Sequence, residues 1–235
     1  SASFFNQNQF KIDKNSGAAR VTYPIVIPPG RNQLQPNLDL VYNSQDGQPS
    51  SIFGQGWSIG IPHIERMNKQ GVDALYATNT TKFFASSLDG ELSTTTASSS
   101  YIARTENGSF NRYTFANNQW TLTDKNGTQY LFGSATSSQQ TDPNNASNTY
   151  RWMLEKVTDT SSNTISFAYF KDAGQMYPSS TVYTGNVTSP GIFEVDFLRA
   201  TSTDSATSSA AGFAVKSNYR ISEITAKVNG TWVRR

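Results

Sequence analysis

Hydrophobic and polar residues alternate with a period of two along the first ordered part of the chain. The apolar positions of this pattern are Val21, Tyr23, Ile25 and Ile27, followed by Leu38, Leu40 and Tyr42. Such alternation is typical of β-strands with one buried face. The sequence therefore predicts two strands joined by a stiff loop at Pro28-Pro29-Gly30. Pro24 cannot donate a ladder hydrogen bond, so we expect an edge or a bulge there.

Turn signals recur about every 8 to 12 residues from position 101 onward, which is the spacing of consecutive strands. Asn-Gly pairs, favoured in two-residue hairpins, begin at Asn107, Asn126 and Asn229. We expect hairpins of 120–124 with 128–132 and of 226–228 with 231–233. Further strands are predicted at 150–157, 164–170, 181–183, 192–198 and 219–227. Low-complexity stretches at 93–100, 134–148 and 200–211 are predicted to be surface loops.

The composition agrees with an all-β protein. Ser, Thr, Asn and Gln contribute 89 of the 235 residues against 36 charged residues, and 29 aromatic residues are enough for a sizeable core. We therefore expect antiparallel sheets and hairpins that form part of a β-shell or sandwich-like scaffold, with little or no helix. A net charge of +2 gives no signal for nucleic acid, and no apolar run approaches the length of a membrane span.

Residues suited to catalysis or metal binding are scarce. The only histidine, His63, lies two positions from Glu65, and cysteine is absent. Most aspartates stand in turn contexts, and no calcium-loop spacing occurs. Ser58 lies in a Gly-x-Ser-x-Gly spacing, but no helix-forming run follows it, so the match is expected to be accidental. We predict neither a catalytic residue nor a cofactor or metal.

Aromatic side chains beside polar residues offer an alternative, a sugar-binding platform. Trp57, Tyr76, Trp120 and Tyr130 are the candidates, although their alternating positions favour core packing. The glycines around Trp57 suggest backbone packed closely over its indole. We therefore predict that Trp57 is a core residue.

Several short motifs between residues 17 and 66 are specific. They are Gly17-Ala18-Ala19, Tyr23-Pro24-Ile25, Pro28-Pro29-Gly30-Arg31, Pro36-Asn37-Leu38, Tyr42-Asn43-Ser44, Gly54-Gln55-Gly56-Trp57-Ser58 and Ile64-Glu65-Arg66. This region resembles the N-terminal domain of the SpvB family, which includes the B subunits of insecticidal toxin complexes. The stretch 120–133 continues the resemblance, and 150–169 is similar to a tyrosine/aspartate (YD, or RHS) repeat. Ser162 departs from that repeat, which usually has Gly before Asn163.

The resemblance implies a non-enzymatic, β-rich part of a large virulence protein that is secreted or exported to the cell surface. In toxin complexes such strands build a hollow shell around a toxic C-terminal segment. Some relatives carry a separate ADP-ribosyltransferase, whose activity requires Glu-x-Glu, and this chain contains no such motif. The implied partners are the remainder of its own polypeptide and other toxin-complex subunits.

These expectations give one all-β domain over 1–235, a fragment of a larger polypeptide with an N-terminal extension at 1–16. The residues expected to set its shape are Pro28, Pro29, Gly30, Tyr42, Asn43, Ser44, Gly54, Gly56 and Trp57. The alternative function is an adhesin-like or carbohydrate-binding β-sandwich.

Overall fold

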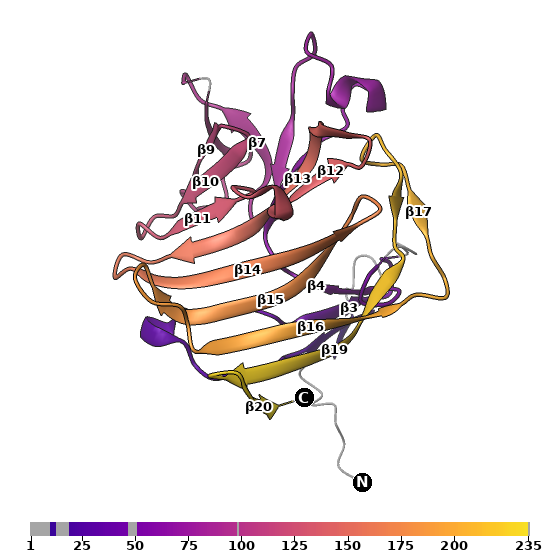
Figure 1. Ribbon diagram of the computed structural model, residues 1–235. Helices are drawn as coiled ribbons and strands as arrows, with labels where there is room; N and C mark the ends of the chain where they lie inside the picture. The colour runs from indigo at the N-terminus through magenta and orange to yellow at the C-terminus, as the bar shows by residue number, and fades with distance from the viewer. Residues whose placement is uncertain (1–9, 13–18, 47–50, 98, 235) are drawn as a thin grey trace.

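The computed structural model describes residues 10–12, 19–46, 51–97 and 99–234, and this part of the chain consists of antiparallel strands with three short 3₁₀ turns and no α-helix (Figure 1). The fold class is therefore as predicted. The strands are β1 (Phe10–Ile12), β2 (Ala19–Tyr23), β3 (Leu40–Asn43), β4 (Trp57–Ile59), β5 (His63–Arg66), β6 (Phe84–Ser86), β7 (Gly90–Thr94), β8 (Ser100–Ala103), β9 (Arg112–Ala116), β10 (Gln119–Thr123), β11 (Gln129–Phe132), β12 (Gln139–Asp142), β13 (Asn145–Thr158), β14 (Asn163–Asp172), β15 (Gln175–Asn186), β16 (Phe193–Thr201), β17 (Thr207–Ser208), β18 (Val215–Lys216), β19 (Tyr219–Val228) and β20 (Thr231–Arg234). The 3₁₀ turns are η2 (Arg31–Gln33), η3 (Val72–Leu75) and η4 (Thr136–Ser138).

Eight strands close into a barrel. The hydrogen-bonded order runs from β11 through β10, β9, β8, β7, β6 and β5 to β13, and β11 also pairs with β13. Closure removes the free edges that an open sheet would expose. Aromatic residues fill the interior, where Trp120 and Trp152 are fully buried and Phe84 packs edge-on against both. The barrel is therefore a packed core.

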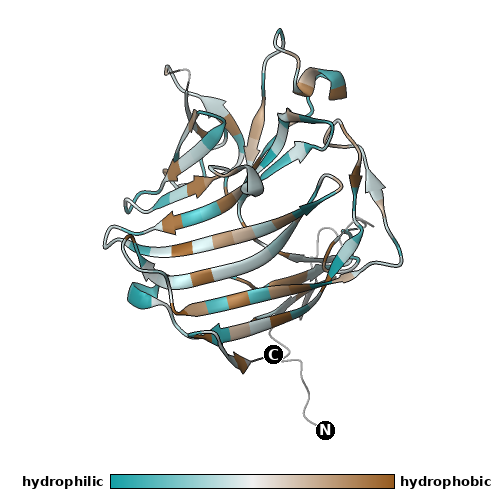
Figure 2. Ribbon diagram, in the orientation of Figure 1, coloured by the Kyte–Doolittle hydropathy of each residue, from teal (hydrophilic) through white to brown (hydrophobic). Residues whose placement is uncertain are grey.

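The second half of the chain forms an open sheet, here called the wall. It continues from β13 through β14, β15, β16 and β19 to the edge strand β20. Hydrophobic and hydrophilic residues alternate along its long strands (Figure 2). Side chains that face inward, such as Ile165, Tyr183 and Val195, belong to the same hydrophobic core as the barrel. Strand β13 belongs to both the barrel and the wall, so the two sheets are continuous through its backbone and its hydrogen bonds.

A small four-stranded sheet, β1–β2–β3–β4, covers the inner face of the wall (Figure 1). Strands β2 and β3 are the two that the N-terminal alternation predicted, and they pair antiparallel. Strand β2 ends at Tyr23, directly before Pro24. Apolar residues of the linking segments, including Ile25, Leu34 and Phe53, pack against the shared core. The expected extension at 1–16 contains β1, and the rest of it lies outside the described residues.

Both predicted hairpins are confirmed, as β10–β11 and β19–β20. The five further strands are also present, and each is longer than predicted, although β16 begins one residue later, at Phe193. The gap between β7 and β8 confirms most of the loop predicted at 93–100. The stretch predicted as a loop at 200–211 contains the end of β16 and the short strand β17.

The prediction of a surface loop at 134–148 is wrong. This stretch forms η4, β12 and the start of β13, and its Ser138, Gln139 and Gln140 are buried. The Gln139 amide donates to the carbonyl oxygens of Asn118 and Gly133, and the Gln140 amide donates to that of Gly174. Buried polar groups are tolerated when they are hydrogen-bonded. Two of the three partners, Asn118 and Gly174, lie more than 20 residues away in sequence, so composition alone could not identify them.

Candidate functional site

The residues expected to set the shape of the N-terminal region fall into two groups. Tyr42, Asn43, Ser44, Gly54, Gly56 and Trp57 meet in one corner of the small sheet, here called the corner motif. The Asn43 amide donates to the Gly56 carbonyl at 2.8 Å. The Ser44 hydroxyl oxygen accepts from the Ala19 amide at 2.9 Å, and the Ser44 amide donates to the Ala19 carbonyl at 3.0 Å. The corner motif therefore joins three strands by reciprocal hydrogen bonds.

Gly56 is required in the corner motif for two reasons. Its φ of 77° lies in the left-handed region that favours glycine. A Cβ at this position would also lie 2.6 Å from Cε2 of Tyr42. Of the three glycines around Trp57, Gly54 has its Cβ position in ordinary contact with Cδ1 of the indole at 3.8 Å, Gly56 makes the close approach to Tyr42, and Gly60 has no atom within 4 Å of its Cβ position.

Trp57 is not a core residue, contrary to the prediction. Its side chain is partly buried, and its ring packs against that of Tyr42 with centroids 5.2 Å apart. It borders a cleft of about 670 Å³ that also involves Phe53, Tyr150 and Met153. The reason is positional, because β4 lies in the small sheet rather than in the barrel, where the fully buried tryptophans lie.

Pro28, Pro29 and Gly30 lie apart from the corner motif, in a loop that contacts the wall. The hydroxyl of Tyr183, on β15, donates to the Pro28 carbonyl at 2.7 Å. Burial raises the pKa of Tyr183 to about 12, so this donor stays protonated at neutral pH. A Cβ on Gly30 would lie 1.9 Å from the Leu34 carbonyl oxygen, so the loop closes on itself only with glycine there. This contact, here called the loop clamp, ties the covering layer to the wall.

A second tie connects Ile52, two residues before the corner motif resumes at Gly54, to the wall. The Ile221 amide, on β19, donates to the carbonyl of Ile52 at 2.7 Å. The sequence analysis did not identify Ile221 or Tyr183. Each lies in a strand with ordinary alternation, and the neighbouring sequence does not reveal the long-range hydrogen bond that the residue makes.

The hairpin that resembles a YD repeat is organised by Asp159. Its Oδ1 accepts from the amides of Ser161 and Asn163, and its Oδ2 accepts from the side-chain amides of Asn163 and Asn32. Burial opposes ionisation, but these hydrogen bonds outweigh it and lower the pKa of Asp159. Ser162 has a φ of 65°, so it adopts the left-handed conformation that the glycine of the repeat would provide. The turn is thus built without glycine, at the cost of local strain.

His63 and Glu65 point outward from the barrel together with Arg151. The Arg151 Nη2 lies 2.5 Å from the Glu65 Oε2, and the His63 Nε2 lies 3.8 Å from the same oxygen. Burial first, and then the charge of Arg151, lowers the pKa of His63 to about 4 against the opposing effect of Glu65. His63 is therefore neutral near pH 7. The cluster is an ion pair with an adjacent neutral imidazole, beside the cleft that Trp57 borders.

Within the residues that the structure describes, the other candidates for catalysis or metal binding lack the neighbouring groups that these functions require. Ser58 is exposed on β4, a strand that leads to Gly60 and Pro62 without a following helix. Among the described residues, no group of three or more His, Cys, Asp or Glu could hold a metal ion. Of the four sugar-binding candidates, Trp120 is fully enclosed in the barrel. No helix in the described part of the chain is long and apolar enough to cross a membrane.

Curated relatives of the chain come from Salmonella. The sequence is 26% identical to the mono(ADP-ribosyl)transferase SpvB of Salmonella typhimurium, over 67% of this chain and 30% of that protein. The SpvB of Salmonella dublin matches with the same identity and coverage. The chain thus spans less than a third of the length of these relatives.

Solved structures share the fold. The N-terminal domain of the effector protein SpvB from Salmonella typhimurium matches with a TM-score of 0.74 at 21% identity, over 88% of this chain and 86% of that one. A crystal structure of TcdB2-TccC3 matches with a TM-score of 0.80 at 18% identity, over 92% of this chain and 14% of that one. The Tc holotoxin pore of Photorhabdus luminescens matches with a TM-score of 0.73 at 17% identity, over 89% and 13%.

The family comparison agrees with the motifs at 17–66 and with the fold. The sequence model described as the Salmonella virulence plasmid 65kDa B protein, SpvB, matches residues 13–190, which is more than half of the chain. The chain therefore belongs to the SpvB family.

Proposed function

We propose that this chain is a structural domain of a toxin-complex-like exported protein, in which it contributes strands to a shell or scaffold that encloses or presents an effector segment. The observation that carries this proposal is the asymmetry of the wall. Its inner face is covered by the small sheet, which is tied to it by the loop clamp and the Ile221–Ile52 hydrogen bond. Its outer edge, β20, has no further strand beside it in the described part of the chain.

The edge strand is suited to receive another strand. Trp232 and Val233 of β20 are each 55% exposed. An uncovered edge with large apolar side chains tends to pair with further strands. We therefore propose that β20 pairs with another part of a longer polypeptide, of which residues 1–235 are one domain, and that toxin-complex subunits are further partners. Secretion or display at the cell surface follows from this proposal.

Amide hydrogen exchange on this chain and on the longer polypeptide tests the scaffold function. We expect the amides of β20 to exchange fast in the chain alone and to become protected in the longer polypeptide, whereas amides of the central strand β14 are protected in both. The variant Trp232→Lys should reduce protection of β20 in the longer polypeptide. Phe110→Lys is the matched control, since Phe110 is an exposed aromatic on the barrel side. Fast exchange of β20 in both proteins would overturn the proposal.

The proposal includes the absence of enzymatic activity in this chain. The curated relatives are named mono(ADP-ribosyl)transferases, but the chain matches only 30% of their length. It contains no Glu-x-Glu motif, and His63 is held beside an ion pair. We expect no transfer of label from NAD⁺ to proteins of a eukaryotic cell lysate. Labelling above that of a heat-denatured sample would contradict this part of the proposal.

A carbohydrate-binding function is not favoured. The family match does not point to it, and Trp120 is unavailable to a ligand. A glycan array distinguishes the two functions, because reproducible binding that is lost on changing an exposed aromatic residue such as Trp232 would support the adhesin alternative.

A further inference from the structure

One end of the barrel holds a partly buried cation, Arg66. Arg66 is the last residue of β5 and shares the inward face with Ile64. Its guanidinium carbon lies 5.3 Å from the ring centroid of Trp152 and 5.5 Å from those of Phe84 and Tyr76. The Arg66 Nε donates to the Thr149 carbonyl at 2.7 Å, but its Nη1 is buried without a hydrogen-bond partner. Such an orphaned charged donor is costly.

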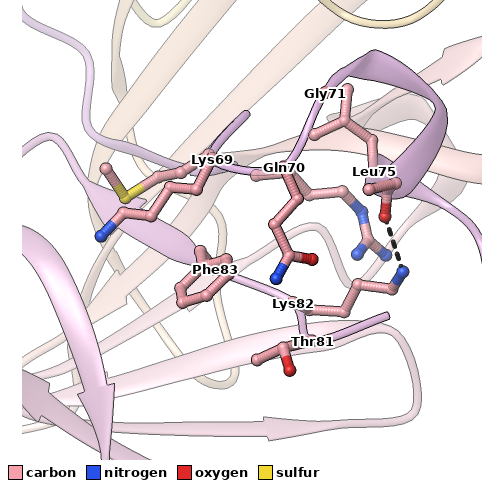
Figure 3. Close-up of a pocket in the computed structure, with 10 residues that line it drawn as sticks. Lys69, Gln70, Gly71, Leu75, Thr81, Lys82 and Phe83 are labelled. Carbon is pink, nitrogen blue, oxygen red and sulfur yellow. Dashed lines mark hydrogen bonds between the residues drawn. The ribbon is translucent and has the colours of Figure 1, made fainter. Parts of the chain in front are cut away.

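A small cavity of about 10 Å³ adjoins this group (Figure 3). The side chains of Gln70 and Lys82 extend into the same region, whereas Lys69 points away and pairs with Glu91. The lining comes from the ends of β5 and η3 and from the segment before β6. Among the described residues that line the cavity, there is no carboxylate. A cavity of this size has room for about one water-sized particle.

The positive charges of Arg66 and Lys82 at the cavity have no carboxylate beside them in its lining. Lys82 donates to the carbonyls of Ala74 and Ala77 and to the Thr80 hydroxyl, which are dipoles rather than anions. Burial lowers the pKa of Arg66. Burial and then the charge of Arg66 lower the pKa of Lys82. Lys82 therefore lies close enough to Arg66 for the charge of one to disfavour the charge of the other.

We propose that this cavity binds a single monatomic anion, of the chloride or bromide class, through the Nη1 of Arg66 with Lys82 as the second cation. Because the cavity has room for about one water-sized particle, a monatomic anion fits it better than phosphate does. A bound halide supplies both the missing acceptor and the missing negative charge, whereas a water molecule supplies only the acceptor. The anion would join the η3 segment to the end of the barrel and stabilise their contact.

Thermal unfolding of the chain at constant ionic strength tests the site, with sodium gluconate replaced stepwise by sodium bromide. We expect the melting temperature of the wild type to rise by about 2 to 4 °C at a bromide concentration about five times the dissociation constant, and to keep rising with the logarithm of bromide concentration above that. Arg66→Met keeps apolar volume against the three rings and should abolish this bromide-dependent rise. Lys69→Met is the matched control and should retain it. Equal bromide responses of wild type and Arg66→Met would overturn the proposal.

Crystals of the wild type grown in bromide give a measurement that does not depend on the folding of a variant. We expect an anomalous peak within hydrogen-bond distance of the Arg66 Nη1. A water molecule in that position, without anomalous signal, would show that solvent satisfies the guanidinium and would overturn the anion site. Either result leaves the scaffold function untouched, because that function depends on the wall.

Discussion

The barrel and the wall solve the same physical problem in different ways. Both are antiparallel sheets joined at β13, and both must bury one apolar face and satisfy their edge strands. The barrel does this by closing on itself around Trp120, Trp152 and Phe84. The wall stays open. The small N-terminal sheet covers its inner face, and β20 remains as an edge strand. Closure makes the barrel self-sufficient, whereas the wall depends on segments distant in sequence.

This difference explains what the motifs of the covering layer do. The corner motif and the loop clamp hold the covering layer in place over the wall, and they belong to a region that contributes few fully buried side chains. Their role is to fix backbone geometry through glycines and hydrogen bonds. The barrel also carries parts of the family pattern, at 64–66 and 120–133, and there Gly133 is required because a Cβ would lie 2.4 Å from Cδ1 of Trp152.

Truncation of one tryptophan in each region should give the largest difference in stability between the barrel and the covering layer. Trp152→Ala empties the barrel and leaves the Asn118 carbonyl without its 2.8 Å donor, so we expect a loss of about 3 to 5 kcal/mol in the free energy of unfolding. Trp57→Ala removes a partly buried ring and should cost about 1 to 2 kcal/mol. Urea unfolding followed by circular dichroism measures both. Equal losses would mean that the covering layer is as tightly packed as the barrel.

The pH dependence of stability should report on His63, where the barrel faces the cleft. Its pKa is about 4 in the folded state and 6.5 in the unfolded state, so the unfolded chain binds a proton first as the pH falls. Stability should therefore decrease between about pH 6.5 and pH 4, by about 1 to 3 kcal/mol, and this contribution levels off below pH 4.

The variant His63→Gln isolates this contribution. Its stability should lack the part of the decrease that falls between pH 6.5 and pH 4, while the carboxylate-driven decrease at lower pH remains. Unfolding curves at half-unit pH steps measure the difference. Parallel profiles of wild type and variant would show that His63 titrates normally in the folded protein.

The loop clamp should be sensitive to a single hydroxyl. Tyr183→Phe removes the donor to the Pro28 carbonyl and should cost about 1 kcal/mol. Tyr169→Phe is the matched control, since its hydroxyl donates to Leu154 within the core of the wall. Only Tyr183→Phe should accelerate tryptic cleavage after Arg31, in the loop that the clamp holds. Equal cleavage rates in the two variants would show that the loop is held by other contacts.

The smallest expected effect is a gain in stability at the hairpin between β13 and β14. Ser162→Gly relieves a non-glycine residue at a φ of 65° and should raise the free energy of unfolding by about 0.5 to 1 kcal/mol. Ser161→Gly serves as the control, because Ser161 does not have a positive φ and the change should be neutral or destabilising. A loss of stability in Ser162→Gly would indicate that the serine side chain stabilises this turn.

The sequence by itself predicted β2, β3, the strands from β13 to β16, β19, both hairpins and the family, but not β4 to β9 or β12. Period-two alternation and Asn-Gly turns are local signals, because side-chain direction and turn conformation depend on neighbouring residues. The motif glycines could also be identified, since a positive φ at Gly56 requires glycine whatever surrounds it. These features need no knowledge of distant segments.

Only the tertiary structure decided which strands close into a barrel, which stay open and what covers them. The burial of Gln139 and Gln140, the partial exposure of Trp57 and the pairing of Tyr183 with Pro28 all depend on contacts between residues far apart in sequence. The same is true of Arg66, which in the sequence is one polar residue after an alternating strand and in the fold is a cation enclosed by three rings. Burial is a property of the assembled layers, so no local pattern could supply it.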